Sequence, residues 1–217
     1  MRLRVSAARP IAVATGNADK FREIVFAWGP SPPPLRQALA MPVVDERFET
    51  YEENALLKAR ELATLTDAPA LADDSGIEIE ALGWKPGVRS ARTPTPDASP
   101  EERNAHILGS LRGVAGAGRR ARFVCACALV VPGFAPIVAR GEAEGLIAAS
   151  PSGSGGFGYD PIFFYPPLGM TFAQAGPERK NAMSHRGKAI RALRALLAPH
   201  IVMQSYAADA LPPRSNA

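Results

Sequence analysis

Residues 70–80 read Ala-Leu-Ala-Asp-Asp-Ser-Gly-Ile-Glu-Ile-Glu, and this stretch carries the most informative pattern in the chain. An apolar run precedes Asp73 and Asp74, and alternating apolar and acidic residues follow Gly76, as expected for strand segments on both sides of a turn. Adjacent carboxylates raise each other's pKa unless a cation neutralises them. Because Mg²⁺ binds carboxylate and phosphate oxygens together, the pair favours a metal site at a strand end. A solvated turn with two capping aspartates is the alternative.

The surrounding sequence predicts a mixed α/β protein. Thr50, followed by Glu53, forms a capping box for one helix, and Ser184 caps the last helix. We expect strands at residues 11–15, 71–73, 76–81, 123–131, 137–148 and 159–164, and helices at 19–28, 51–65 and 100–111, with a last helix that starts after Ser184 and ends before Pro199. Strands interspersed with helices in this order predict a mixed sheet with helices packed on it. Residues 1–202 are expected to form one domain and 203–217 a flexible tail.

Composition narrows the class of protein. Hydrophobic residues make up 47% of the 217 residues, enough for a full core. We expect no contact with a membrane, because no run approaches the roughly 20 apolar residues that a membrane span needs, and the N-terminus lacks the apolar region of a signal peptide. Cys125 and Cys127 are two residues apart in a predicted strand, so both are expected to face one side as buried small hydrophobes. A reducing, cytoplasmic location fits this pattern.

The charge pattern is compatible with more than one ligand. The formal net charge is +4, which suits an anionic small substrate as well as a nucleic acid. Aromatic residues make up only 7% of the chain and do not alternate with basic residues along a strand, which argues against nucleic acid. We therefore expect no nucleic-acid partner, and a nucleic-acid-binding module is kept as the rival from another class.

The segment Thr15-Gly16-Asn17-Ala18-Asp19-Lys20 lies at a predicted strand–turn–helix junction. Backbone N–H groups at a helix start attract phosphate, and Lys20 adds a positive charge one turn later. The segment is not a Walker A loop, because GxxxxGK[ST] is missing. An ordinary turn with a surface lysine is the alternative.

Residues 153–158, Gly-Ser-Gly-Gly-Phe-Gly, match GxGxxG, but a dinucleotide site is not expected there. That motif opens a helix, whereas a strand-like segment with Pro161 follows here. Glycines let the backbone approach a ligand, and Phe157 is a candidate for stacking on a base. A flexible hairpin loop with a core phenylalanine is the alternative.

Lys180, His185 and Arg186 lie at and before the start of the last predicted helix. Lys and Arg only donate hydrogen bonds, so this cluster suits anions and carbonyl oxygens, although a histidine there is also a common helix cap. No GxSxG nucleophile motif or short-spaced His/Cys zinc pattern is present. Acids, glycine loops and cations together indicate metal-assisted phosphoryl chemistry.

Several blocks, in order, resemble the Ham1/RdgB family of inosine/xanthosine triphosphate pyrophosphatases. They span residues 15–23, 50–59, 72–76, 86–92, 155–163 and 180–187. The resemblance implies an elongated fold of two lobes around a long mixed β-sheet with flanking helices, an active site in the cleft between the lobes, and a homodimer. It also implies hydrolysis of ITP, dITP and XTP to the monophosphate and pyrophosphate, with Mg²⁺ as cofactor.

The resemblance also implies roles for individual residues. Asp74 resembles the proton acceptor and a Mg²⁺ ligand, and Glu46 resembles the second metal-linked carboxylate, with Asp45 as a near rival. Phosphate and sugar are assigned to Thr15, Gly16, Asn17, Ala18, Asp19, Lys20, Ser75 and Lys180, and the base pocket to Phe157, Gly158, Tyr159, Asp160, His185 and Arg186. The segment 45–49 lacks the family's usual Glu-Glu-Thr-Gly run.

Donor and acceptor chemistry accounts for part of the expected selectivity. Hypoxanthine and xanthine present a 6-oxo acceptor that Arg186 and a suitably protonated His185 can satisfy, whereas the 6-amino group of adenine leaves those donors unpaired. The sequence identifies no residue that rejects the 2-amino group of guanine. A related pyrophosphatase that prefers modified pyrimidines is the nearest enzymatic alternative.

Overall fold

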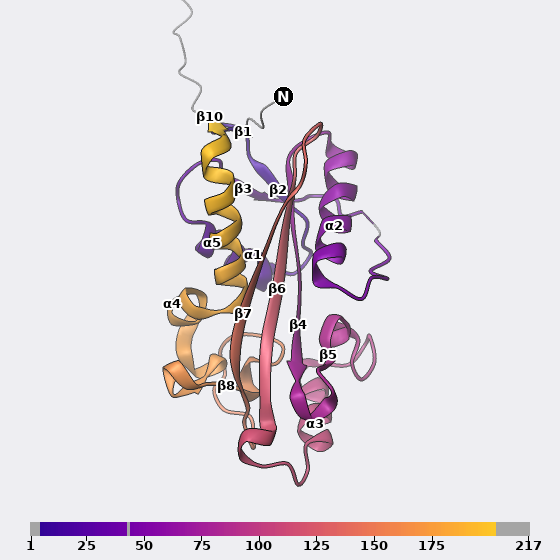
Figure 1. Ribbon diagram of the computed structural model, residues 1–217, viewed down its shortest axis with the longest axis vertical. Coiled ribbons are helices and arrows are strands. Elements are labelled where there is room, and N and C mark those ends of the chain that lie inside the picture. Colours follow the sequence, from indigo (N-terminus) through magenta and orange to yellow (C-terminus); the bar gives the residue numbers. More distant parts are fainter. Residues whose placement is uncertain (1–4, 43, 203–217) are drawn as a thin grey trace, which may run out of the picture.

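A mixed sheet of eight strands is the frame of the structure, a computed structural model that describes residues 5–42 and 44–202 (Figure 1). The strand order is β3-β2-β4-β6-β7-β8-β9, with β5 paired to β4. The strands are β2 (Ile11–Val13), β3 (Leu35–Gln37), β4 (Ala70–Ile79), β5 (Lys85–Pro86), β6 (Arg120–Val130), β7 (Ile137–Ile147), β8 (Phe163–Tyr165) and β9 (Met170–Thr171). β2 pairs in parallel with β3 and β4, and the other pairs are antiparallel, so the predicted mixed sheet is confirmed.

Helices and short 3-10 segments cover this sheet. The α-helices are α1 (Ala18–Trp28), α2 (Tyr51–Thr66), α3 (Pro100–Ser110), α4 (Phe172–Met183) and α5 (His185–Leu197). The 3-10 segments are η1 (Glu80–Leu82), η2 (Gly87–Arg92), η3 (Gly116–Arg119), η4 (Asp160–Ile162), η5 (Pro166–Leu168) and η6 (Ala198–His200). A small parallel pair, β1 (Val5–Ser6) with β10 (Ile201–Val202), lies apart from the main sheet. Among the described residues, none of the helices combines the length and apolarity needed to cross a membrane.

β4 is one continuous ten-residue strand, so the predicted break between residues 73 and 76 is wrong. Its antiparallel pairing with β6 runs unbroken through the polar residues, with Asp73 opposite Cys127 and Asp74 opposite Ala126. The two acids therefore lie in the middle of a strand. Because successive side chains in a strand point to opposite faces, they also face away from each other.

The two faces of the sheet carry separate apolar cores. On one face, Ile24 of α1 and Ile190 of α5 pack with Leu71 and with sheet residues from β2, β6 and β7. On the other face, α2 packs its small residues, such as Ala55 and Ala59, against alanines of β2, β4 and β6. A third core lies at the end of the molecule where Figure 1 shows α3, and joins α3 and α4 to β4, β6 and β8. The long strands β4, β6 and β7 connect these regions.

All four predicted helices are confirmed, and the errors elsewhere have local causes. α1, α2, α3 and α5 lie within one residue of the predicted bounds at each end. α4 escaped prediction because Gly176 (φ 74°) and Pro177 interrupt its pattern. The expected strand over 159–164 is wrong in part, because Asp160–Ile162 forms a 3-10 turn and β8 begins only at Phe163. The predicted tail, 203–217, lies outside the described residues.

The strand cysteines agree with the prediction. Cys125 and Cys127 face the same side of β6, are buried and form no disulfide, and their Sγ atoms lie within hydrogen-bond range at 3.7 Å.

Gly141 of β7 permits the close approach of α5, and we expect its replacement by alanine to destabilise the protein. A Cβ at this position would lie 2.3 Å from the carbonyl oxygen of His185 and 2.5 Å from the amide nitrogen of Ala189. Because these are backbone atoms, α5 must shift, and Gly141→Ala should lower the free energy of unfolding by about 1–3 kcal/mol. Urea denaturation measures the change. Gly109→Ala in α3, where a Cβ meets nothing within 4 Å, is the control and should be neutral or slightly stabilising. Equal stability of the two variants would contradict this account of α5 packing.

Candidate active site

The junction between β2 and α1 forms a rigid turn suited to anions. The side-chain oxygen of Asn17 caps α1, accepting hydrogen bonds from the backbone N–H groups of Asp19 (2.9 Å) and Lys20 (3.0 Å). Thr15 Oγ1 accepts a hydrogen bond from the N–H of Asn17 at 3.2 Å and so fixes the turn from behind. Gly16, Asn17 and Ala18 are exposed. The positive end of the helix dipole therefore faces solvent beside Lys20.

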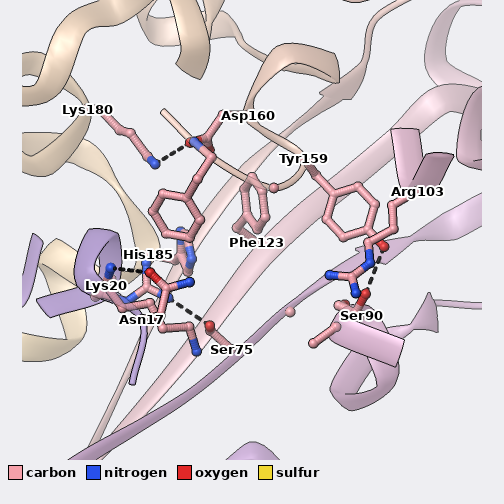
Figure 2. Close-up of a pocket in the computed structure, with 15 residues that line it drawn as sticks. Asn17, Lys20, Ser75, Ser90, Arg103, Phe123, Tyr159, Asp160, Lys180 and His185 are labelled. Atoms are coloured by element: carbon pink, nitrogen blue, oxygen red, sulfur yellow. Dashed lines mark hydrogen bonds and ion pairs between the residues drawn. The ribbon is translucent and has the colours of Figure 1, made fainter. Parts of the chain in front are cut away.

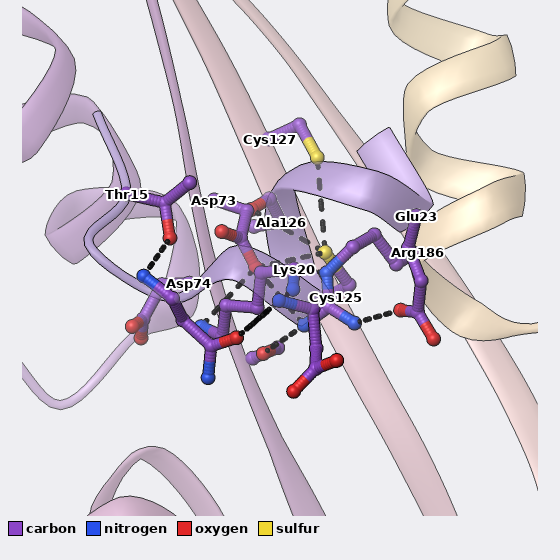
Figure 3. Close-up of polar contacts among 12 residues, drawn as sticks. Thr15, Lys20, Glu23, Asp73, Asp74, Cys125, Ala126, Cys127 and Arg186 are labelled. Atoms are coloured by element: carbon purple, nitrogen blue, oxygen red, sulfur yellow. Dashed lines mark hydrogen bonds and ion pairs between the residues drawn. The ribbon is translucent and has the colours of Figure 1, made fainter. Parts of the chain in front are cut away.

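A buried ion network lies behind this turn (Figure 3). Arg186, only 1% exposed, donates to Asp73 Oδ2 through Nε and Nη2, both at 3.1 Å, and it also donates to Glu23. Its Nη2 reaches Ser75 Oγ at 2.8 Å. Burial opposes ionisation of Asp73, but the positive charges of Lys20, Arg186 and Lys58 outweigh it and hold the pKa of this carboxyl well below its usual range. Asp73 is therefore an anion that neutralises protein cations.

Lys180 extends the network towards the glycine-rich loop. Its ammonium lies 2.6 Å from Glu23 Oε1 and also pairs with Asp160. Asp160 Oδ2 accepts the N–H of Phe157 at 2.8 Å, so this carboxylate holds the loop in place. Burial raises the pKa of Asp160, and Lys180 partly offsets that effect. Lys180 Nζ also lies 4.4 Å from the centroid of the Phe157 ring, within cation–π range.

Asp74 belongs to a second cluster, on the opposite face of β4. Lys58 Nζ lies 2.9 Å from Asp74 Oδ1 and 2.8 Å from Glu46 Oε1, and Asn54 Nδ2 is 3.5 Å from Asp74 Oδ2. Burial raises the pKa of Asp74 and Lys58 offsets part of that rise, whereas for Glu46 the charge of Lys58 outweighs burial and lowers the pKa. Protein cations therefore lie against both acids, with Lys20 and Arg186 paired with Asp73 and Lys58 paired with Asp74.

Lys58 and Glu23 stand in the blocks that resemble the family, but the sequence assigned them no role in the site. Lys58 lies one turn after Asn54 on α2, and Glu23 lies one turn after Lys20 on α1. Each pair therefore shares a helix face, and in each case that face contacts β4 acids. The helical spacing of these polar residues was the signal that would have identified them.

The carboxylates around Lys58 fit a hard divalent cation. Glu46 shares Lys58 with Asp74, whereas Asp45 is exposed, which favours Glu46 of the two candidates. Within residues 5–42 and 44–202, no group of three or more His, Cys, Asp or Glu side chains is arranged to hold a metal. Mg²⁺ needs no such group, since it commonly binds one or two carboxylates together with waters and substrate phosphates.

A pocket joins the anion-binding turn to the aromatic loop (Figure 2). It is lined by ten of the predicted site residues, namely Asn17, Lys20, Ser75, Phe157, Gly158, Tyr159, Asp160, Lys180, His185 and Arg186. Gly76, Ser90, Ala91, Arg103 and Phe123 also line it and were not predicted. Thr15, Gly16, Ala18, Asp19, Asp74 and Glu46 lie outside this lining.

His185 is a neutral imidazole in this pocket. Its ring stacks on Phe123 with centroids 4.6 Å apart, and the residue is only 3% exposed. Burial, followed by the charges of Arg186 and Lys180, lowers the pKa of His185 well below its usual value. A neutral ring offers one N–H donor and one acceptor. The form of His185 that can donate to a 6-oxo group is therefore a neutral tautomer with a single N–H.

Fold and site together define an α/β protein with a cleft for an anionic ligand that carries a flat ring. A family model described as the Ham1 family matches residues 11–196. A dITP/XTP pyrophosphatase from Thermus thermophilus is 46% identical over 187 residues, covering 84% of this chain and 89% of that protein. Another, from Geobacter sulfurreducens, is 45% identical over 197 residues, covering 89% of this chain and 97% of that protein.

A solved structure agrees with these sequence matches. A HAM1 protein from Coxiella burnetii has a TM-score of 0.78 and 38% identity, and the match covers 88% of this chain and all (100%) of that one. The chain belongs to the Ham1 family.

Removal of Arg186 should destabilise the fold. Arg186→Ala leaves the carboxylates of Asp73 and Glu23 buried without their main partner, and breaking a buried pair in this way typically costs about 3–5 kcal/mol. Urea denaturation measures the loss. The control is Arg60→Ala, at an exposed position of α2, which should change stability little. A loss no greater than the control's would show that the network does not stabilise the fold.

The neutral state of His185 predicts a pH dependence of stability. The pKa is lowered in the folded state, so only the unfolded chain takes up the proton as pH falls below the unfolded value of about 6.5. The free energy of unfolding should therefore fall by up to about 1.4 kcal/mol per pH unit below that value. Urea titrations between about pH 5 and 7 test this. His185→Gln should remove that part of the slope, whereas His106→Gln at an exposed site should retain it.

Proposed function

We propose that this protein hydrolyses ITP, dITP and XTP to the nucleoside monophosphate and pyrophosphate, and so removes deaminated purines from the nucleotide pool. The observation that carries the proposal is one pocket lined both by the anion-binding turn, through Asn17 and Lys20, and by the base-stacking candidate Phe157. It is supported by relatives named dITP/XTP pyrophosphatases that match most of the chain.

The phosphates bind at the start of α1. The N-terminal end of this helix attracts negative charge, and Lys20 and Lys180 supply ammonium groups that line the pocket. Lys20 is the more adaptable of the two, since its side chain is 23% exposed whereas that of Lys180 is 4% exposed. Thr15, Gly16, Ala18 and Asp19 contribute by shaping the turn.

Asp74 orients and deprotonates the attacking water. A general base works best when its pKa is closer to the working pH, and burial raises the pKa of Asp74 in that direction. Lys58, 2.9 Å away, keeps the carboxylate ionised and fixes its direction. Water attacks the α-phosphorus, and pyrophosphate leaves on the opposite side.

Asp74 and Glu46 would hold Mg²⁺. Both carboxylates contact the ammonium of Lys58, so their oxygens lie near one another around a positive charge. Carboxylate oxygens so placed are the ligands that Mg²⁺ prefers. Bound Mg²⁺ supplies charge stabilisation on phosphate oxygens.

The base is selected by its 6-oxo group. The single N–H of neutral His185 donates a hydrogen bond, which favours an oxo group over the amino group of adenine. Arg186 contributes chiefly by positioning, because its donors already bind Asp73, Glu23 and Ser75. Phe157 stacks on the base, and Gly158, Tyr159 and Asp160 hold that loop.

Three further properties belong to the proposal. The protein acts as a homodimer, which rests on the family resemblance. It works in the cytoplasm, which the two buried free cysteines support. The chain up to residue 202 forms a single domain of two lobes, and residues 203–217 lie outside the described part.

The substrate range and the role of Asp74 can be tested together. We expect pyrophosphate release from ITP, dITP and XTP but not from ATP, GTP or dUTP, with loss of activity in EDTA. Asp74→Asn keeps the shape of the side chain but removes the base, so kcat should fall about 100-fold or more. Asp97→Asn, at an exposed loop position, is the matched control and should retain full activity.

The outcomes separate the alternatives. Release from modified pyrimidine triphosphates alone would favour the pyrimidine-specific relative. Salt-sensitive nucleic-acid binding without any hydrolysis would favour the binding module. An Asp74→Asn enzyme with unchanged kcat would exclude Asp74 as the base.

A further inference from the structure

Arg103 lines the active-site pocket from α3 and was assigned no role by the sequence. Its Nη2 donates to the carbonyl oxygen of Pro96 at 2.9 Å. Its Nε is buried and has no hydrogen-bond partner among the described residues. A buried N–H group without a partner is costly, so it points to an acceptor that a ligand supplies.

Charge pairing distinguishes Arg103 from the other cations of the pocket. Lys20 lies 3.3 Å from Asp73, Lys180 lies 2.6 Å from Glu23, and Arg186 lies 3.1 Å from Asp73. Arg103 forms no ion pair with any carboxylate in residues 5–42 and 44–202. It is the one pocket-lining cation in that described part of the chain whose charge is uncompensated.

The position of Arg103 identifies the part of the substrate that it meets. Figure 2 shows Arg103 beside Tyr159, across the pocket from Lys20 and Asn17. The guanidinium is close enough to Tyr159 for its charge to oppose the burial that raises the pKa of this phenol to about 12. The phosphates are bound at the Lys20 side, so the group that reaches Arg103 belongs to the nucleoside end.

The surroundings of Arg103 also fit a base. Phe123 and Phe157 also line the pocket, and Phe157 offers an aromatic ring on which a purine can stack. α3 is fixed relative to the aromatic loop, because Asn104 Nδ2 donates to the carbonyl oxygen of Gly158 at 3.1 Å. Arg103 is thus held at a defined place opposite His185.

We propose that Arg103 determines specificity at the 2-position of the purine, donating a hydrogen bond to the 2-oxo group of xanthine and rejecting the 2-amino group of guanine. A base that turns its 6-oxo group towards His185 presents the edge with position 2 to α3. At position 2, xanthine has an oxygen acceptor, hypoxanthine has a hydrogen, and guanine has an amino donor. The 2-amino donor of guanine would face the guanidinium, which is also a donor, so neither group would have a hydrogen-bond acceptor. This inference rests on the proposed hydrolysis of purine triphosphates.

The test compares kcat/KM for XTP, ITP and GTP in the wild type and in Arg103→Gln. We expect kcat/KM for XTP to fall about 10- to 100-fold, as for loss of a hydrogen bond to a charged group. The value for ITP should change little, and the ratio of GTP to ITP should rise. Arg112→Gln, which removes the same charge at an exposed position just after α3, should leave all three values unchanged. Equal losses for XTP and ITP in Arg103→Gln would overturn the proposal.

Two further measurements distinguish a contact between Arg103 and the base from a contact with the phosphates. Inhibition by inorganic tripolyphosphate should be the same in the wild type and in Arg103→Gln, and weaker inhibition of the variant would assign Arg103 to the phosphates instead. Arg103→Lys, checked for folding by thermal denaturation, should recover part of the XTP activity, because it restores a cationic donor.

Binding of XMP and IMP, followed by calorimetry, decides the question without turnover. Arg103→Gln should weaken XMP binding selectively, and equal effects on XMP and IMP would contradict the proposal. If the wild type hydrolyses none of the triphosphates, the proposed function fails, while this binding comparison still tests Arg103.

Discussion

The buried pairing of Arg186 with Asp73 and Glu23 is the interaction on which the rest of the site depends. It joins α5 to the middle of β4 and to α1, three elements far apart in the sequence. Buried charges are tolerated only when they are paired and hydrogen-bonded, so each partner restricts where the others can lie. Through Ser75 and Lys180, which contact the same network, this constraint also sets the positions of the pocket wall and of the Phe157 loop.

The alternation of β4 places two adjacent acids in different environments. Asp73 faces α1 and α5, where the positive charges of Lys20 and Arg186 keep its carboxylate ionised and paired. Asp74 faces α2, where burial raises its pKa and a single lysine holds it at 2.9 Å. A strand is the only regular element that sends neighbouring residues to opposite sides, so the Asp-Asp sequence needs a strand for this division. The same alternation lets one strand serve both faces of the sheet.

Local patterns in the sequence were sufficient for the long elements but not for the contacts between them. The helices starting at residues 18, 51, 100 and 185 have caps and periodicity that are readable in the sequence, whereas α4 is hidden by Gly176 and Pro177. The continuity of β4 depends on its β6 partner, which no local pattern reveals. For the same reason, the role of Arg103 becomes clear only once α3 is packed against the loop.

Charge compensation has a consequence for how the pocket receives a triphosphate. Asp73 is paired with both Lys20 and Arg186, so it keeps the Arg186 partner if Lys20 moves away. The Lys20 side chain is 23% exposed, whereas that of Asp73 is fully buried at 0%. Lys20 can therefore exchange its carboxylate for a phosphate without leaving a buried anion unpaired. Lys180, 4% exposed and bound to both Glu23 and Asp160, has no such freedom and acts as a fixed charge. The site thus combines one adaptable and one rigid cation, and under the proposed function this would let binding energy come from the phosphates while the geometry around the base stays constant.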